Sequence, residues 1–370
     1  MPGPARLWSR RSLLLSGFAA RLMAQKPPAA TFPSDWKRYP DPTTELEVYQ
    51  LTDPAHTSTL PAYYNRALAR SSGWMLFCCD RGGSPQAFRM DLRNGQTRQL
   101  SEAQELDGAS LTLTPDNRSF CNFAGRSLSI ATLLTLRSRE LYSIPEGWER
   151  CPGLSVGPDG THAVFAERRG EGSRLRMVPL AQGAARTVVE TPFVMSDPIA
   201  RPMRAQILFR QGAEALWMVN ADGSQKRPLK LASGRIGPAN WAADGKTVLY
   251  LNIPDDPAQL RAIREFTPDT NTDKLVAKTS QFAHFGFNTN TSVFVGASRN
   301  AASPTILLLL RVARREFTLC EHKASRPETV APLFAPDSQR VYFQSDQHGK
   351  SALYGMHVER LVEKIEAETY

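Results

Sequence analysis

A short pattern that recurs seven times constrains the fold of this 370-residue chain more than any other feature. Each copy has an apolar residue, two spacers and a turn residue, and a β-rich run follows, as in Val156-Gly-Pro-Asp159 before His162. The turn positions of the seven copies are residues 71, 116, 159, 203, 244, 290 and 337, which are 41 to 47 residues apart. A period of this length is typical of four-stranded propeller blades.

The remainder of each copy also has the character of a blade. In the first copy, the strand-like segments Ala87–Leu92 and Thr97–Leu100 flank the turn Asn94-Gly95. Such Asn-Gly and Asp-Gly pairs favour two-residue hairpins, because these residues tolerate positive φ. The seventh copy lacks an outer strand, which the upstream segment Leu46–Leu51 can supply. We therefore predict an all-β fold, a seven-bladed β-propeller over residues 41–358, closed by an N-terminal strand that removes the open edge.

Both ends of the chain fall outside the repeat. Residues 1–24 resemble a twin-arginine (Tat) signal peptide, because Arg10-Arg11 precedes a short apolar stretch. A disordered basic tail is the alternative for this segment. Residues 25–40 indicate a linker, and residues 359–370 indicate a helical tail. Removal of residues 1–24 takes away four arginines and lowers the formal net charge from +9 to +5. The expected location of the protein is periplasmic or secreted.

Composition excludes several classes of protein. The chain has no apolar run of the roughly 18 residues that span a bilayer, so stable membrane insertion is not expected. Pairs such as Arg168-Arg169 lack interleaved aromatic residues, so a nucleic-acid partner is not expected either. The five cysteines contain no Cys-x-x-Cys pair, which disfavours zinc ribbons and disulfide scaffolds and predicts buried thiols. The sequence leaves the oligomeric state open.

The repeat aligns the positions at which the inner strands of the blades begin. Six residues before each turn position stand Asn65, Ser110, Gly153, Asp197, Pro238, His284 and Ala331. We expect these positions to surround one mouth of the central channel. Asn65, Asp197 and His284 carry side chains suited to ligand binding, but a metal site usually needs about three protein ligands. His284 could bind a metal or could bond to neighbouring backbone.

Three further residues are candidates for substrate binding. Tyr64 and Arg66 flank Asn65 and combine a stacking surface with a cation, a mixture that sugar sites and ordinary loops both contain. Arg201 stands two residues before the fourth turn position. Its guanidinium could bind a carboxylate with two parallel hydrogen bonds, and a surface salt bridge is the alternative role.

With the repeat placed, the sequence resembles the oligogalacturonate lyase family of polysaccharide lyases over nearly all of residues 40–358. The segments that carry the resemblance include Trp217–Gly223, Phe334–Tyr354, Trp74–Gly83, Asp197–Pro202 and Gly237–Gly245. Members of this family are seven-bladed propellers that cleave short galacturonate chains by β-elimination. The resemblance implies a base that removes the proton α to the uronate carboxylate. It also implies a divalent metal, typically manganese, and an arginine near the substrate.

The implied metal site matches this sequence only in part. His284 corresponds to one metal-binding histidine of the family. The other implied ligands are a glutamine and two histidines, and Arg326, Thr329 and Ala331 stand at those positions here. The resemblance therefore assigns His284 to a metal and leaves Arg326 as a candidate for substrate binding.

The implied catalytic residues also differ. Pro238 stands at the position of the family's catalytic base, and proline has no side chain that accepts a proton. The family's arginine falls at Ala215, and the nearest cations on that blade are Arg201, Arg204 and Arg210. We take Arg201 as the candidate catalytic residue.

Two functions remain open from the sequence. The first is an exported lyase-like enzyme for pectin-derived galacturonate chains, with activity in doubt because the base and most metal ligands are absent. The second is a non-catalytic propeller that binds an acidic oligosaccharide or a protein partner. Both predict an acidic ligand, which agrees with the positive net charge.

Overall fold

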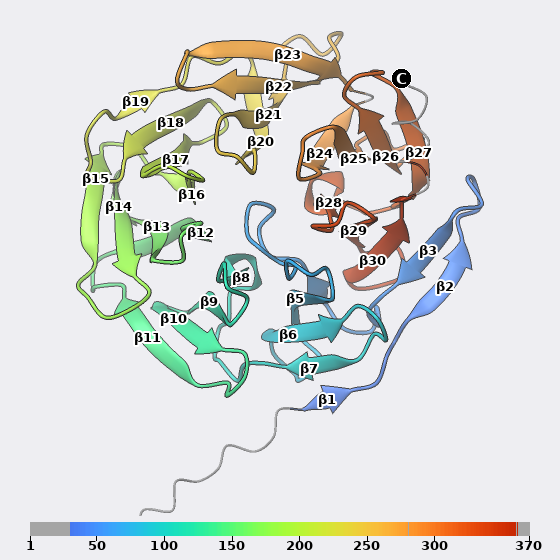
Figure 1. Cartoon of the computed structure of the whole chain (residues 1–370), viewed down its shortest axis with the longest axis horizontal. Coiled ribbons are helices and arrows are strands. Elements are labelled where there is room, and N and C mark those ends of the chain that lie inside the picture. Colours follow the sequence, from blue (N-terminus) through green and yellow to red (C-terminus); the bar gives the residue numbers. More distant parts are fainter. Residues whose placement is uncertain (1–29, 280, 360, 362–370) are drawn as a thin grey trace, which may run out of the picture.

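The structure of the protein is a computed structural model, which describes residues 30–279, 281–359 and 361. Seven antiparallel sheets stand around a central channel, as Figure 1 shows in a view close to the channel axis. The prediction of a seven-bladed β-propeller is confirmed. The predicted signal peptide lies outside the described residues, and of the predicted helical tail only Glu359 and Leu361 are described. Within these ranges, no helix is long and apolar enough to cross a membrane.

The first four blades follow the chain order, and each starts with its innermost strand. Blade 1 contains β4 (Ser58–Thr59), β5 (Trp74–Cys79), β6 (Gln86–Asp91), β7 (Thr97–Gln99) and β1 (Thr31–Phe32). Blade 2 contains β8 (Thr112–Leu113), β9 (Ser119–Ala124), β10 (Ser127–Thr132) and β11 (Ser138–Ser143). Blade 3 contains β12 (Glu149–Val156), β13 (His162–Arg169), β14 (Gly172–Pro179) and β15 (Arg186–Thr191). Blade 4 contains β16 (Ser196–Ala200), β17 (Gln206–Gln211), β18 (Ala215–Asn220) and β19 (Arg227–Pro228).

The last three blades complete the ring. Blade 5 contains β20 (Arg235–Trp241), β21 (Val248–Ile253), β22 (Ala262–Thr267) and β23 (Thr272–Lys278). Blade 6 contains β24 (Phe282–Phe287), β25 (Val293–Ser298), β26 (Thr305–Leu310) and β27 (Glu316–Glu321). Blade 7 contains β28 (Leu333–Phe334), β29 (Arg340–Ser345), β30 (Ala352–His357), β3 (Glu47–Gln50) and β2 (Lys37–Pro40). Short 3-10 helices, η1 (Gly108–Ser110) and η2 (Pro327–Thr329), precede β8 and β28.

The N-terminal segment closes the ring, as the sequence predicts. Tyr49 and Gln50 of β3 pair with Gly355 and Tyr354 of β30, so the first and last parts of the propeller share one sheet. The predicted linker over residues 25–40 is too long, however. Strand β2 pairs along the outside of β3, and β1 pairs with β7 on the outside of blade 1. The propeller therefore begins about ten residues earlier than expected, because both outer edges gain strand partners there.

The seven turns explain the repeat. In every copy, one backbone N–H two residues before the turn position donates to the carbonyl five residues further on; the seven donors are Ala69, Thr114, Gly157, Arg201, Ala242, Asn288 and Ala335. The loops therefore hold four residues and not the two expected. In the clearest copies the turn Asp accepts from the N–H two residues later, as Asp159 does from Thr161 at 3.0 Å. The next residue has positive φ, 72° at Gly160, which favours Gly and Asn.

Apolar side chains between neighbouring sheets form the core. Seven separate clusters of buried residues fill the spaces between blades, with Tyr250, Tyr354, Phe165 and Phe294 among the largest fully buried side chains. The alternation of each strand sends one set of side chains toward one neighbouring blade and the next set toward the other. All five cysteines are buried and free, as predicted. The blades thus form a rigid ring that holds the residues at the channel mouths in place.

Candidate functional site

The inner strands all begin at one mouth of the channel, here called the entry mouth, and end at the opposite turn mouth. Asp197, Pro238 and His284 lie near the starts of β16, β20 and β24. A Cβ atom at Gly153 of β12 would lie 2.7 Å from the Cα of Asp197 and 2.8 Å from the Tyr64 hydroxyl. Gly153 has a φ of 102°, which L side chains rarely adopt. The aligned positions therefore converge, as the repeat predicts.

Two tyrosines from blade 1, here called the tyrosine plug, cross the channel. Figure 1 shows the blue segment before β5 reaching the centre of the ring. The Tyr63 hydroxyl donates to the carbonyl of Ala239 and accepts from its N–H, both at 3.1 Å. The Tyr64 hydroxyl donates to Oδ1 of Asp197 at 2.9 Å, and the two tyrosine rings lie 4.9 Å apart. The plug thus joins blade 1 to blades 4 and 5; the sequence indicates Tyr64 but not Tyr63.

His284 packs against this plug. Its ring lies 5.0 Å from the ring of Tyr63 in an edge-to-face arrangement, and only 6% of the residue is exposed. Burial lowers the pKa of His284 to about 4, and the nearby Arg210 charge acts in the same direction. The imidazole is therefore neutral near pH 7. Its Nδ1 atom is buried without a hydrogen-bond partner, which leaves one ring nitrogen uncommitted.

Arg210 is the cation that the structure places beside this group. It lies near the end of β17, its Nε is 3.7 Å from Oδ2 of Asp197, and it donates to the carbonyls of Ile236 and Gly237. Burial raises the pKa of Asp197, while Tyr64 and Arg210 oppose this effect. Sequence reasoning names Arg210 only as a nearby cation. The sequence signal that could have placed Arg210 at the entry mouth is topological. The second strand of a blade runs antiparallel to the inner strand, so it ends at the mouth where the inner strand begins.

Arg201 does not join this group. It follows the end of β16, at the turn mouth, and is 2% exposed. Its Nε donates to the carbonyl of Gly245 at 2.6 Å, and its Nη1 lies 3.1 Å from Oδ1 of Asp269. The guanidinium also stacks over Trp241 at 4.9 Å. These contacts join blades 4 and 5. Arg201 thus lies at the turn mouth, whereas His284 lies toward the entry mouth.

The other candidate residues divide between the two mouths. Asn65 donates to the carbonyl of Ala109 at 3.2 Å, while its Oδ1 is buried without a partner. Arg66 donates to the carbonyl of Pro115 at 3.1 Å, toward the turn mouth. Together with Tyr64, these residues line a cavity of about 350 Å³ between the plug and the turn mouth. Arg326 lies just before η2 on the entry side and is exposed.

Three arginines gather at the entry mouth between blades 5 and 6. Arg235, Arg261 and Arg299 are here called the rim arginines. Arg261 donates to the carbonyl of Phe282, at the start of the strand that carries His284, at 2.7 Å. Its pKa is lowered by burial and by the charges of Arg299 and Arg235, against one opposing acid, Glu328. Among the described residues, none of the three has a carboxylate within 4.0 Å. The rim therefore presents cationic charge that the fold does not neutralise.

The chain is similar to known proteins over most of its length. The chain is 24% identical to an oligogalacturonide lyase of Pectobacterium atrosepticum, over 87% of this chain and 96% of that protein. It is 24% identical to an oligogalacturonate lyase of Dickeya dadantii, over 85% and 94%. A solved oligogalacturonate lyase in complex with manganese superposes with a TM-score of 0.84, at 23% identity, over 89% of this chain and 98% of that one.

The chain resembles oligogalacturonate lyases in sequence and in fold. The resemblance drawn from the repeat is confirmed, and it covers nearly the whole length of both curated relatives. No model of a known protein family matches the chain. The shared fold is the seven-bladed propeller.

The manganese of the solved oligogalacturonate lyase does not fit the residues found here. In the described part of the chain, no group of three His, Cys, Asp or Glu side chains is placed to hold a metal ion. Among the described residues, no carboxylate or second imidazole shifts the pKa of His284, and the one charged group that does is the cation Arg210. Thr329 and Ala331 lie before β28, where the resemblance implies histidines. A lone neutral imidazole beside a guanidinium is a poor site for a divalent cation.

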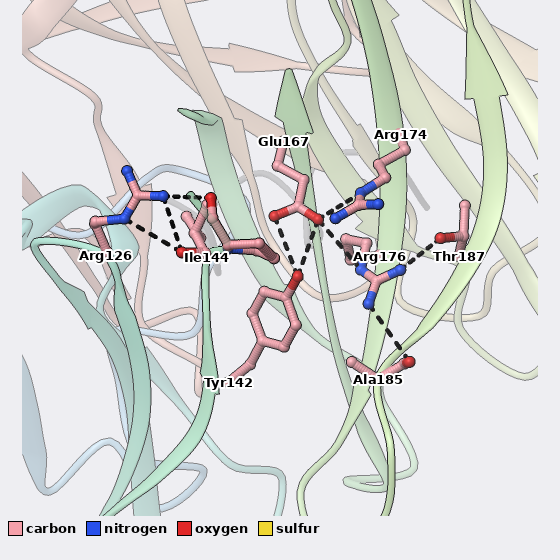
Figure 2. Close-up of polar contacts among 9 residues, drawn as sticks. Arg126, Tyr142, Ile144, Glu167, Arg174, Arg176, Ala185 and Thr187 are labelled. Atoms are coloured by element: carbon pink, nitrogen blue, oxygen red, sulfur yellow. Dashed lines mark hydrogen bonds and ion pairs between the residues drawn. The ribbon is translucent and has the colours of Figure 1, made fainter. Parts of the chain in front are cut away.

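A second buried charge cluster lies between blades 2 and 3, and Figure 2 shows its contacts. Glu167 of β13 is fully buried and forms ion pairs with Nε of Arg174 at 2.6 Å and of Arg176 at 3.3 Å. Tyr142 of β11 donates to the same carboxylate at 3.0 Å. Arg174 also stacks on Trp148 at 3.7 Å. Both carboxylate oxygens of Glu167 have partners, so this cluster joins two blades through a fully paired carboxylate.

Proposed function

We propose that the protein binds short galacturonate chains, the acidic oligosaccharides derived from pectin, at the entry mouth. The observation that carries the proposal is the full-length similarity to oligogalacturonate lyases in both sequence and fold. The rim arginines support it, because a guanidinium pairs with a carboxylate through two parallel hydrogen bonds. A galacturonate chain presents one carboxylate per sugar, so neighbouring arginines can engage neighbouring sugars.

The described residues support recognition better than metal-assisted cleavage. Eliminative cleavage needs a base for the proton α to the carboxylate and a positive group that stabilises the resulting charge. Pro238 supplies no base at the position that the resemblance implies, and the donors for a metal are missing from the described chain. Arg210 is already bonded to two backbone carbonyls and lies beside Asp197.

A lyase with a rebuilt site is the second candidate, and His284 is the observation that favours it. Its imidazole is neutral and keeps an uncommitted Nδ1, which is the state that a general base requires. In this candidate His284 takes the proton, without a metal, and the rim arginines hold the carboxylate. The two candidates differ in whether an unsaturated product forms.

Calorimetric titration with trigalacturonate tests the proposal directly. We expect saturable binding that weakens about tenfold or more in Arg261→Met, since a hydrogen bond to a charged group contributes roughly 1.5–3 kcal/mol. Arg168→Met is the matched control, because Arg168 is exposed and forms an ion pair with Glu149 within blade 3, away from the rim arginines. Absence of saturable binding to the unmodified protein would contradict the proposal.

The absorbance of unsaturated product in the ultraviolet separates the two candidates. For recognition alone, we expect no increase in absorbance at high protein concentration, with or without manganese. An increase that disappears in His284→Phe would establish the second candidate. An increase that persists in that variant would exclude His284 as the base.

We also propose that residues 1–24 direct export by the twin-arginine route. The Arg10-Arg11 pair before an apolar stretch supports this role. Cell fractionation should place the full-length protein in the periplasm or medium, and Arg10→Lys with Arg11→Lys should retain it in the cytoplasm. An unchanged distribution in the double variant would contradict the proposal.

A further inference from the structure

A second cavity, here called the seam cavity, lies where blade 7 meets blade 1. It measures about 410 Å³ and is lined by Trp36, Tyr49, Leu51, Leu92, Arg93, Arg340, Tyr342, Gly355, Met356 and His357. This volume is within the range of small-molecule sites, roughly 300–1,000 Å³. The seam is the place where the N-terminal strands close the ring, and Arg340 stands at the start of β29, beside the loop at the turn mouth. The seam cavity is therefore separate from the entry mouth.

The pairing of the strands explains how the walls of the seam cavity form. Arg340 and Tyr342 alternate along β29, opposite His357 and Gly355 of β30, and Tyr49 of β3 also pairs with Gly355. Residues two apart along a strand share one face, so these side chains all face the same way. The ring of Tyr342 packs over Gly355, because a Cβ there would lie 3.0 Å from two ring carbons of Tyr342.

Three polar atoms of the seam cavity lack protein partners. The Nε1 of Trp36, the Nε of Arg340 and the hydroxyl of Tyr342 are all buried without hydrogen bonds. Burial raises the pKa of Tyr342, so its hydroxyl remains protonated near pH 7. All three groups can therefore donate hydrogen bonds. Buried polar groups are normally paired, and three unpaired donors around one cavity indicate a ligand that accepts hydrogen bonds.

The charge of the seam cavity favours an anion. Arg93 is neutralised by two hydrogen bonds to Asp91, at 3.2 and 2.8 Å. Arg340 donates to the carbonyl of Leu92 at 3.4 Å and also lies beside the Tyr342 hydroxyl, where its charge opposes the rise in the pKa of Tyr342; no carboxylate of the described residues lies within 4.0 Å of Arg340. The Tyr49 hydroxyl already donates to Glu47 at 3.1 Å, so this tyrosine offers its ring. One uncompensated guanidinium thus remains.

The rest of the seam cavity wall is apolar and aromatic. Leu51, Leu92 and Met356 are buried, and the rings of Trp36 and Tyr49 meet edge to face at 6.4 Å. A sugar would bring hydroxyl donors that these walls cannot accept, whereas a flat apolar ring suits them. We propose that the seam cavity is a binding site for a small aromatic carboxylate. Its carboxylate accepts from Arg340, Trp36 and Tyr342, and its ring packs against Leu92 and Met356.

The test is calorimetric titration of the full chain with benzoate, with benzyl alcohol as a neutral counterpart and galacturonate as a sugar acid. We expect one benzoate site with a Kd on the order of 1 mM or tighter, as suits a ligand of this size. Benzyl alcohol and galacturonate should bind at least about tenfold more weakly, because they lack either the charge or the flat ring. Equal binding of either compound, or no saturable binding of benzoate, would overturn the proposal.

Two variants locate the site. Arg340→Met removes the cation and Trp36→Phe removes one donor while keeping an aromatic ring; we expect at least about tenfold and about threefold weaker benzoate binding, respectively. Arg168→Met should bind benzoate like the unmodified protein. Benzoate affinity that is unchanged in both Arg340→Met and Trp36→Phe would place the ligand elsewhere and overturn the assignment. Trigalacturonate binding should be the same in all three variants, which separates this site from the proposed function.

Discussion

The cluster around Glu167 and the group around Asp197 both bury a carboxylate, yet they differ in how completely its partners satisfy it. Glu167 has two arginines and a tyrosine within 3.3 Å. Asp197 has one tyrosine at 2.9 Å and a looser arginine at 3.7 Å, and the neighbouring His284 has an unpaired nitrogen. A fully paired cluster holds two blades together, whereas a partly paired one retains groups that a ligand can use.

The largest effect is expected from Glu167→Gln. This variant removes the charge that two buried arginines share, and breaking a buried ion pair costs about 3–5 kcal/mol of folding free energy. Urea denaturation should show this loss. Glu149→Gln is the matched control, since the exposed Glu149–Arg168 pair should contribute less than about 1 kcal/mol. Similar losses of folding free energy in Glu167→Gln and Glu149→Gln would mean that burial does not make the Glu167 ion pairs more stabilising than the exposed pair.

A smaller effect is expected from Tyr64→Phe in the plug. The variant keeps the ring but removes the hydrogen bond to Asp197, at a cost of about 1–2 kcal/mol, because a buried charged acceptor loses a donor. Tyr142→Phe makes the same chemical change beside Glu167, where two arginines remain. We expect the loss measured by urea denaturation to be larger for Tyr64→Phe. The reverse order would contradict the contrast between the two clusters.

Asp197 should also make the free energy of unfolding fall as pH rises, which is the reverse of the effect of most carboxylates in folded proteins. Its pKa in the folded state is raised above the ordinary value of 3.8, mainly by burial. The folded state therefore binds more protons than the unfolded state between 3.8 and the raised pKa, and the contribution of Asp197 to stability falls as pH rises through that window. Asp197→Asn should lack this fall when unfolding is measured from pH 3 upward. Parallel pH profiles for the two proteins would show that the carboxylate titrates normally.

The smallest effect is expected from manganese. A metal that binds the folded state raises the melting temperature, and the stabilisation grows with the logarithm of the metal concentration divided by its Kd. Because the described residues lack a donor set around His284, manganese and a chelator should leave the melting temperature of the protein unchanged. A rise that disappears in His284→Phe would reveal a metal site at His284 and contradict this expectation.

The fold was accessible from the sequence because the repeat encodes a local hydrogen-bond pattern. Each turn residue, such as Asp159, fixes one loop, and seven loops at a constant period define seven blades. The closing strand Leu46–Leu51 was also predictable, since the last blade lacked an outer strand. Strands β1 and β2 were not, because their segment is rich in proline and carries no copy of the repeat.

The candidate site was predictable only where the repeat register applies. It aligned Asp197, Pro238 and His284, which converge at the entry mouth. It did not place Arg201, because Arg201 follows Asp197 by four residues, and β16 carries the chain from the entry mouth to the turn mouth over that distance. Arg210 and Tyr63 belong to a neighbouring strand and to a loop that crosses the channel, and their proximity to His284 depends on the closed ring.

The closure of the ring has a consequence for folding order. Thr52, next to β3, accepts a hydrogen bond from Leu353, 301 positions further along the chain. Strand β3 pairs locally with β2, but its other edge can pair only after β30 has been synthesised. Contacts of such long sequence separation slow folding. A truncation before β30 would leave β3 without the partner that joins it to blade 7, and the ring would stay open.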